Sequence, residues 1–169
     1  MGHVHTGFLS KTAQWNAIVQ QLSLFGGDAD IEYLYERTDD YPAHCLLIEA
    51  TLSEKTNQRI MEMESVSRHL GEYIIKNNDE NAYCVFISTF LHINVVSDFR
   101  NRKTYPYFSS DGSKSVDGLK ILPLQTSELK GFLEKGLIYK ELYGIFERAY
   151  RSEADVREWY DKKIAHPVR

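Results

Sequence analysis

The sequence predicts an α/β protein in which helices flank a mixed central sheet of about four to five strands. Three observations support this prediction. Residues 31–36 alternate apolar with polar or aromatic residues at a period near two, and residues 45–48 form a continuous apolar run after a turn, as in a β-hairpin. A long amphipathic segment follows, and residues 82–88 then form a continuous apolar run of strand length. The order strand, helix, strand indicates parallel pairing through a right-handed crossover connection.

The size and composition of the chain fit a single domain spanning residues 1–169. This length can bury one core but is short for two. No apolar run reaches the length of a membrane span, so no membrane segment is expected. The N-terminus shows no signal-peptide pattern, which makes the cytoplasm the expected compartment. Cys45 and Cys84 each lie in an apolar run, so we expect two buried thiols without a disulfide.

The predicted elements begin with a short amphipathic helix. Its apolar residues recur at spacings of three and four between residues 11 and 22, and Ser10 is the expected cap. Gly26 and Gly27 then give the backbone the freedom to enter the hairpin sharply. Residues 38–42 supply the turn of the hairpin, because Asp and Pro favour turn conformations.

A long helix is expected from near residue 56 or 57 to Lys76. Its apolar stripe consists of Ile60, Met63, Val66, Leu70, Tyr73 and Ile74. Glu62, Ser65 and His69 share a neighbouring face because they lie three and four residues apart, and Arg68 flanks them. On the residues alone, this polar face is either a solvated surface or part of a site.

The segment after residue 88 is predicted to contain one more helix and the last strand. The helix covers residues 94–103 and ends in three cations, Arg100, Arg102 and Lys103. Such cations either complement the helix dipole or contact phosphates. Residues 105–113 are expected to form a loop. The strand is expected at 119–124, where Pro123 favours an edge position or ends the strand.

Three C-terminal helices are predicted after that strand. The first runs from a cap at Thr126 and Ser127 to Gly136, the second covers 139–150, and the third begins at a Ser152 cap. The second helix carries an aromatic stripe of Tyr139, Leu142, Tyr143, Phe146 and Tyr150. A stripe of this kind indicates core or a partner surface more often than base stacking.

Two carboxylates are expected to meet at one end of the hairpin. Asp30 directly precedes the first strand, and Glu49 directly follows the apolar run of the second. Antiparallel pairing brings the start of one strand near the end of the other. Two carboxylates at the end of a buried strand are costly unless a cation lies between them, and a divalent cation is the usual one. Asp28 is a rival for Asp30, since residues two apart share a face.

The segments around these carboxylates resemble a known nuclease pattern. An acidic residue, then a second acidic residue after an apolar strand with a polar residue two places later, is the pattern of the PD-(D/E)XK nucleases. The more specific segments are Asp-Ile-Glu at 30–32, Ile-Glu-Ala-Thr at 48–51, the Glu62 to His69 run, Phe-Ile at 86–87 and Pro-Leu at 123–124. In this order, over roughly residues 26–124, they are similar to the AlwI-like type IIS restriction endonucleases and to the small cleavage subunits of heterodimeric relatives.

The resemblance implies a restriction-endonuclease-like core with extra C-terminal helices and a metal-dependent site. Asp30, Glu49 and the backbone carbonyl of Ala50 would bind Mg²⁺, as one ion or two. The ion would polarise the scissile phosphate and lower the pKa of a bound water.

The same resemblance implies a catalytic set around the metal ligands. Thr51 stands where the commoner pattern has a lysine that orients the water, and threonine cannot carry its charge. Arg68, His69 and Lys55 are the candidates for that role, and nothing in the sequence chooses among them. Glu62 would bind a second ion or orient a water.

The net charge of −4 argues against a protein that binds DNA unaided, because such proteins usually present a basic face. The resemblance implies double-stranded DNA as the substrate and a larger DNA-recognition or nicking subunit as the partner, with this chain cutting one strand. Two alternatives stay open. One is a catalytically silent dimerisation or regulatory module with a nuclease fold, in which Asp30 and Glu49 form salt bridges. The other is an enzyme acting on a different phosphoester such as RNA.

Overall fold

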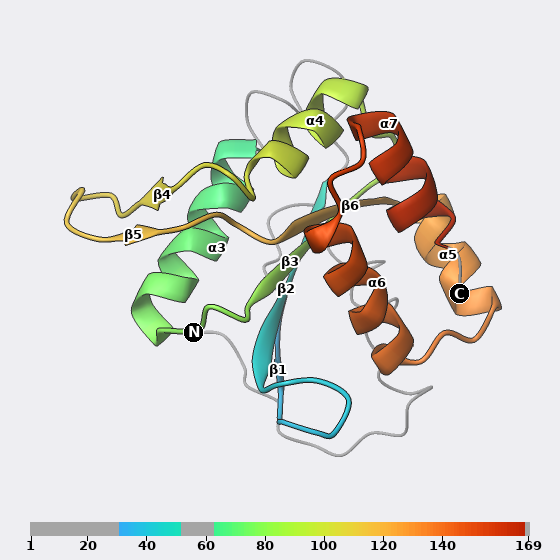
Figure 1. Ribbon diagram of the computed structural model, residues 1–169, viewed down its shortest axis with the longest axis horizontal. Helices are drawn as coiled ribbons and strands as arrows, with labels where there is room; N and C mark the ends of the chain where they lie inside the picture. Colours follow the sequence, from blue (N-terminus) through green and yellow to red (C-terminus); the bar gives the residue numbers. More distant parts are fainter. Residues whose placement is uncertain (1–30, 52–62, 168–169) are drawn as a thin grey trace.

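The computed structural model describes residues 31–51 and 63–167. Its main sheet has four strands in the order β1, β2, β3, β6 (Figure 1). They are β1 (Ile31–Tyr35), β2 (His44–Thr51), β3 (Tyr83–Ser88) and β6 (Ile121–Gln125). β1 is antiparallel to β2, whereas β2 and β3 pair in parallel, as do β3 and β6. The predicted hairpin and mixed sheet are therefore confirmed.

Helices cover both faces of this sheet. α3 (Met63–Asn77) connects β2 to β3, and α4 (Ile93–Asn101) follows β3. The C-terminal part adds α5 (Thr126–Glu134), α6 (Tyr139–Arg151), α7 (Val156–Glu158) and the π-helical segment η2 (Trp159–Ala165). Figure 1 shows α3 on one side of the sheet and α6 on the other. The extra C-terminal helices of the prediction are thus present.

The burial of each strand follows from its position in the sheet. Every residue of β3 is buried, and so are residues 44–48 of β2, because helices pack on both faces of these inner strands. β1 lies at an edge and alternates between half-buried and exposed residues. β6 forms the other edge, as Pro123 indicated, but the strand continues beyond that proline to Gln125. Both cysteines are buried and free, as expected.

The structure differs from the prediction between residues 105 and 116. Instead of a loop, this stretch holds a two-stranded hairpin of β4 (Tyr107–Phe108) and β5 (Ser115–Val116). Gly71 lets the hairpin approach α3 closely, because a Cβ at this position would lie 2.2 Å from the Tyr107 ring. Strands of two residues are too short to show a period in the sequence, so the hairpin depends on this packing.

The predicted cap of α5 is wrong by one residue. Gln125 is the N-cap, rather than Thr126 or Ser127. The Glu128 carboxylate accepts a hydrogen bond from the Gln125 backbone N–H at 2.8 Å. A glutamate three residues after the cap satisfies an N–H that the helix leaves unpaired, so it fixes where the helix begins.

The predicted Ser152 cap is also wrong, since Ser152 is the residue that ends α6. Asp155 caps α7 instead, because its carboxylate accepts hydrogen bonds from the backbone N–H groups of Arg157 (2.9 Å) and Glu158 (3.0 Å). These same bonds, with that of Glu158 foremost, lower the pKa of Asp155. An ionised carboxylate at this position also complements the helix dipole, which gives it an advantage over a hydroxyl.

The cations at the end of α4 serve the fold. The Arg100 guanidinium donates to the backbone carbonyl of Ala154. Lys103 donates to the Ser152 carbonyl and to the Glu153 carboxylate, both at 2.8 Å. These two side chains tie α4 to the segment between α6 and α7, so they are not offered to a phosphate. Arg102 is the C-cap residue of α4.

The aromatic stripe of α6 faces the core. Tyr139, Tyr143 and Phe146 are buried, and Leu142 is buried with them. Tyr139 stacks on Tyr35 of β1 with ring centroids 3.7 Å apart. Four of the five residues of the stripe are therefore core, and Tyr150 at its end is partly buried.

Two predicted features lie outside the described residues, namely the first amphipathic helix with Gly26 and Gly27, and the start of the long helix before Met63. In the part of the chain that the structure describes, no helix has the length and apolar character needed to cross a membrane.

Candidate active site

Glu49 lies near the carboxyl end of β2. The apolar residues before it are buried, whereas its own side chain retains 13% exposure. Side chains alternate along a strand, so Cys45, Leu47 and Glu49 share one face of the sheet, and His44, Leu46 and Ile48 share the other. The helix α3 packs on the Glu49 face. A carboxylate here is held by a rigid strand while it stays accessible to solvent.

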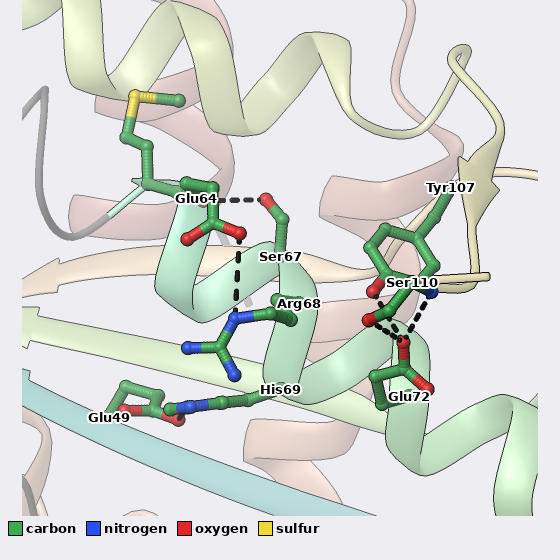
Figure 2. A network of polar contacts seen from close by, with 9 residues as sticks. Glu49, Glu64, Ser67, Arg68, His69, Glu72, Tyr107 and Ser110 are labelled. Atoms are coloured by element: carbon green, nitrogen blue, oxygen red, sulfur yellow. Dashed lines mark hydrogen bonds and ion pairs between the residues drawn. The ribbon is translucent and has the colours of Figure 1, made fainter. Parts of the chain in front are cut away.

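His69 of α3 contacts this carboxylate. Its ring nitrogen Nδ1 lies 2.7 Å from Oε1 of Glu49, and the imidazole is 29% exposed (Figure 2). Val66 and Leu70, on the same side of α3, are buried against the sheet and fix the helix in place. An ionised carboxylate only accepts hydrogen bonds, so Nδ1–H of His69 donates to Glu49. In the neutral form, the lone pair of the ring is then at Nε2.

Arg68 points elsewhere. Its Nε lies 3.5 Å from Oε1 of Glu64, one helical turn earlier, and both side chains are exposed (Figure 2). Successive residues of a helix are about 100° apart around its axis. This rotation separates Arg68 from His69, so the structure brings only one of the two to Glu49.

Thr51 ends β2, and the sheet register places it in one row with two other polar residues. Thr51 pairs with Ser88 of β3, and Ser88 pairs with Gln125 of β6. All three are the last residues of their strands. Ser88 is buried, and its hydroxyl donates to the carbonyl of Phe90 at 3.0 Å. Ser88 is not among the predicted site residues, although a polar residue closing an apolar run is a usable signal.

A second polar cluster connects α3 to the β4–β5 hairpin. Oε1 of Glu72 accepts hydrogen bonds from the Tyr107 hydroxyl (3.1 Å), the Ser110 hydroxyl (2.9 Å) and the Ser110 backbone N–H (3.0 Å) (Figure 2). The bonds from Ser110, and then that from Tyr107, lower the pKa of Glu72. This cluster positions the hairpin and uses none of the predicted site residues.

The remaining predicted site residues, Asp30 and Glu62, lie outside the described residues, as do Asp28 and Lys55. Among residues 31–51 and 63–167 there is no group of three or more His, Cys, Asp or Glu side chains that could hold a metal ion. The oxygen donors that are described, the Glu49 carboxylate and the Ala50 carbonyl, fit the preference of Mg²⁺ for hard ligands. The described part thus supplies some of the expected ligand set and a histidine beside it.

Fold and site together define an α/β protein with a solvent-accessible carboxylate at the carboxyl end of an inner strand, where many α/β proteins bind ligands. The family model of the AlwI restriction endonucleases matches residues 23–132, and the chain belongs to this family. A search of curated proteins found no match.

Among solved structures, the chain is similar to the small subunit, R.BspD6I2, of the heterodimeric restriction endonuclease R.BspD6I. The two are 18% identical, with a TM-score of 0.49 over 89% of this chain and 85% of that one.

Proposed function

We propose that this chain is a Mg²⁺-dependent DNA endonuclease, a single nuclease domain over residues 1–169 that cuts one strand of double-stranded DNA beside a larger DNA-recognition subunit. The observation that carries the proposal is the hydrogen bond between His69 and Glu49 at the carboxyl end of β2, in a chain of the AlwI family. This contact joins two segments of the family resemblance that are twenty residues apart.

Asp30, Glu49 and the carbonyl of Ala50 are the proposed ligands of Mg²⁺, as one ion or two. Support comes from the register of the hairpin, because Ile31, next to Asp30 in sequence, pairs with Ile48, next to Glu49. When bound, the ion offsets charge on the phosphate and activates a water. The strand keeps Glu49 in a fixed orientation, which lowers the cost of ordering a ligand at the moment of binding.

The other predicted site residues have roles around these metal ligands. His69 orients the Glu49 carboxylate through its Nδ1–H, as outer-shell groups do for metal ligands. Thr51 lies two residues beyond Glu49 and gives a hydroxyl without charge. Because His69 contacts Glu49, Arg68 and Lys55 stay the candidates for the missing positive charge, and Arg68 would have to leave Glu64 to supply it. The second ion or the water is assigned to Glu62.

The need for a partner follows from charge. A chain with net charge −4 is repelled by the phosphate backbone, and a separate subunit that reads the sequence would supply the missing contacts. Restriction enzymes of this family act on DNA inside the cell, so we assign the chain to the cytoplasm.

Two measurements test the proposal. Thermal unfolding is followed while Mg²⁺ or Ca²⁺ is added, and we expect stabilisation by the ion that is lost in Glu49→Ala and kept in the matched control Glu64→Ala. Plasmid nicking is then measured with and without the product of the neighbouring gene, and nicking is expected only with it. Stabilisation of Glu49→Ala equal to that of the natural chain would refute the metal site. Absence of both stabilisation and nicking would favour the catalytically silent module, in which His69 and Glu49 form a structural pair.

A further inference from the structure

The structure contains a groove of about 850 Å³ at the amino ends of the parallel strands. Its lining includes Pro42, Asn81 and Lys120, which precede β2, β3 and β6, together with residues of α6 and Lys163 of η2. Glu49 lies near the opposite, carboxyl end of β2. The groove is therefore separate from the candidate active site.

The groove is rich in cations although the chain as a whole is acidic. Its lining contains four cations, Lys120, Arg148, Arg151 and Lys163, and two carboxylates, Asp40 and Glu147. Both carboxylates are already paired. Asp40 lies 2.5 Å from Nζ of Lys140, and Glu147 lies 2.6 Å from Nη2 of Arg151 and also accepts from the Tyr83 hydroxyl.

The other three cations of the lining are not neutralised by these two carboxylates. Lys120, Arg148 and Lys163 form no ion pair with any residue in the described ranges. Lys120 is held between the rings of Tyr83 and Tyr150, with Nζ at 5.0 and 5.5 Å from their centroids.

Arg148 is turned along the surface of its own helix. A Cβ at Gly144 would lie 3.2 Å from its Nη1, so the bare glycine leaves room for the guanidinium within the groove. The result is a concave surface with an excess of positive charge and guanidinium donors, which match phosphate oxygens in geometry.

We propose that this groove binds the sugar–phosphate backbone of DNA, at phosphates distant from the scissile one. The proposal rests on the proposed function for one point only, that DNA is the ligand. Residues 44 and 49 are about 17 Å apart along β2 at the usual rise of a strand. Glu49 also lies on the α3 face of the sheet, whereas α6 lines the groove from the other side, so the phosphates bound in the groove are not the scissile one. The groove supplies a local attraction that the net charge of the chain does not.

The test measures binding without cleavage. The full chain is titrated into a fluorescently labelled two-turn duplex at low salt in EDTA, and anisotropy is recorded. The groove variant R148A/K163A is compared with the control K114A/K130A, which removes two cations from other surfaces and so has the same net charge. We expect about tenfold weaker binding, or more, for the groove variant, and a slope of log K against log salt reduced by about 1.8. The control should stay within about twofold of the natural chain.

Several outcomes would overturn the inference. The first is equal weakening of duplex binding by the two double variants, and the second is no binding by the natural chain. The third is displacement of the duplex by a poly-glutamate peptide of equal charge. That result would point to an acidic protein segment as the ligand. Should R148A/K163A fail to fold, R148Q/K163Q is measured instead, because glutamine removes the charge and keeps more of each side chain than alanine does. The duplex titration is made in EDTA and the metal titration is made without DNA, so a failure of the metal site and a failure of the groove give different results.

Discussion

Two histidines near the two ends of β2 show how the same side chain is put to different use. His44, at the amino end, is 3% exposed and lies among the rings of Tyr35, Tyr139 and Tyr143. His69 comes from α3 to the carboxyl end, retains 29% exposure and contacts the carboxylate of Glu49. One histidine is surrounded by aromatic core and the other faces a charge at the surface.

The hydrogen bonds of His44 account for both ring nitrogens. Nδ1 lies 2.7 Å from the Pro42 carbonyl and Nε2 lies 2.6 Å from the Tyr139 hydroxyl. A carbonyl only accepts, so Nδ1–H donates to Pro42, and Nε2 of the neutral ring accepts from Tyr139. Burial lowers the pKa of His44 and favours this neutral form. The neighbours of a histidine therefore determine whether it has a structural role, as His44 has, or a chemical one, as proposed for His69.

The largest expected effect concerns the charge beside His69. Glu49→Gln keeps the shape of the side chain and removes the anionic metal ligand, so cleavage should fall on the order of a thousandfold or more. Glu134→Gln removes an exposed carboxylate from the end of α5 and should leave the rate nearly unchanged. The nicking rates of both variants are measured in the presence of the partner subunit. Equal rates would contradict the assignment of Glu49 to the active site.

The next effect is on stability at the other end of the strand. His44→Ala leaves a cavity in the core and an unsatisfied Tyr139 hydroxyl, so the free energy of unfolding should drop by about 2 to 4 kcal/mol. His69→Ala removes a partly exposed ring and should cost less than about 1 kcal/mol. Denaturant unfolding of both variants compares the two positions directly. A larger loss of unfolding free energy in His69→Ala than in His44→Ala would show that His69, and not His44, has the structural role.

A third effect distinguishes support of a metal ligand from catalysis itself. His69→Gln should reduce cleavage and the affinity for Ca²⁺ together, by about 10- to 100-fold, because an outer-shell group acts through the ligand that it orients. Calorimetric titration with Ca²⁺ supplies the affinity and nicking supplies the rate. A fall in rate at unchanged affinity would instead place His69 in direct contact with the reacting groups.

A fourth effect is the pH dependence contributed by His44. Its pKa is lowered in the folded state from an ordinary value of 6.5, so the unfolded state binds the proton more readily. The contribution of His44 to the free energy of unfolding is therefore fully present above pH 6.5. It is lost as the pH falls below 6.5, by at most about 1.4 kcal/mol per pH unit. Unfolding is measured between about pH 5 and 6.5, above the range in which carboxylates titrate, and the natural chain should lose stability more steeply there than His44→Gln.

The smallest effect is expected at Arg68. Its ion pair with Glu64 is exposed, and pairs of this kind contribute less than about 0.5 kcal/mol. Arg68→Ala should therefore leave the unfolding transition almost unchanged. Any loss of cleavage in this variant then reports on the positive charge for which it is a candidate, and retention of full cleavage would remove Arg68 from the catalytic set.

The sequence by itself determined the elements whose signal is local. Period-two alternation defined β1, continuous apolar runs defined β2 and β3, and the spacing of three and four defined the buried face of α3 and of α6. The position of Glu49 directly after its apolar run was also visible, together with the family to which the chain belongs. These features are set by residues a few positions apart, which is the range over which periodicity acts.

Tertiary structure decided which distant residues meet. Helical spacing placed Arg68 beside the face of His69 without showing which of the two meets Glu49. The packing of α3 on the sheet brought His69 to Glu49 and left Arg68 with Glu64. The hairpin at residues 105–116 likewise depends on Glu72 and on the space above Gly71. The groove at the amino ends of the strands is assembled from segments more than a hundred residues apart. Contacts of this range depend on how the faces of complete elements pack, and a pattern along the chain does not contain that information.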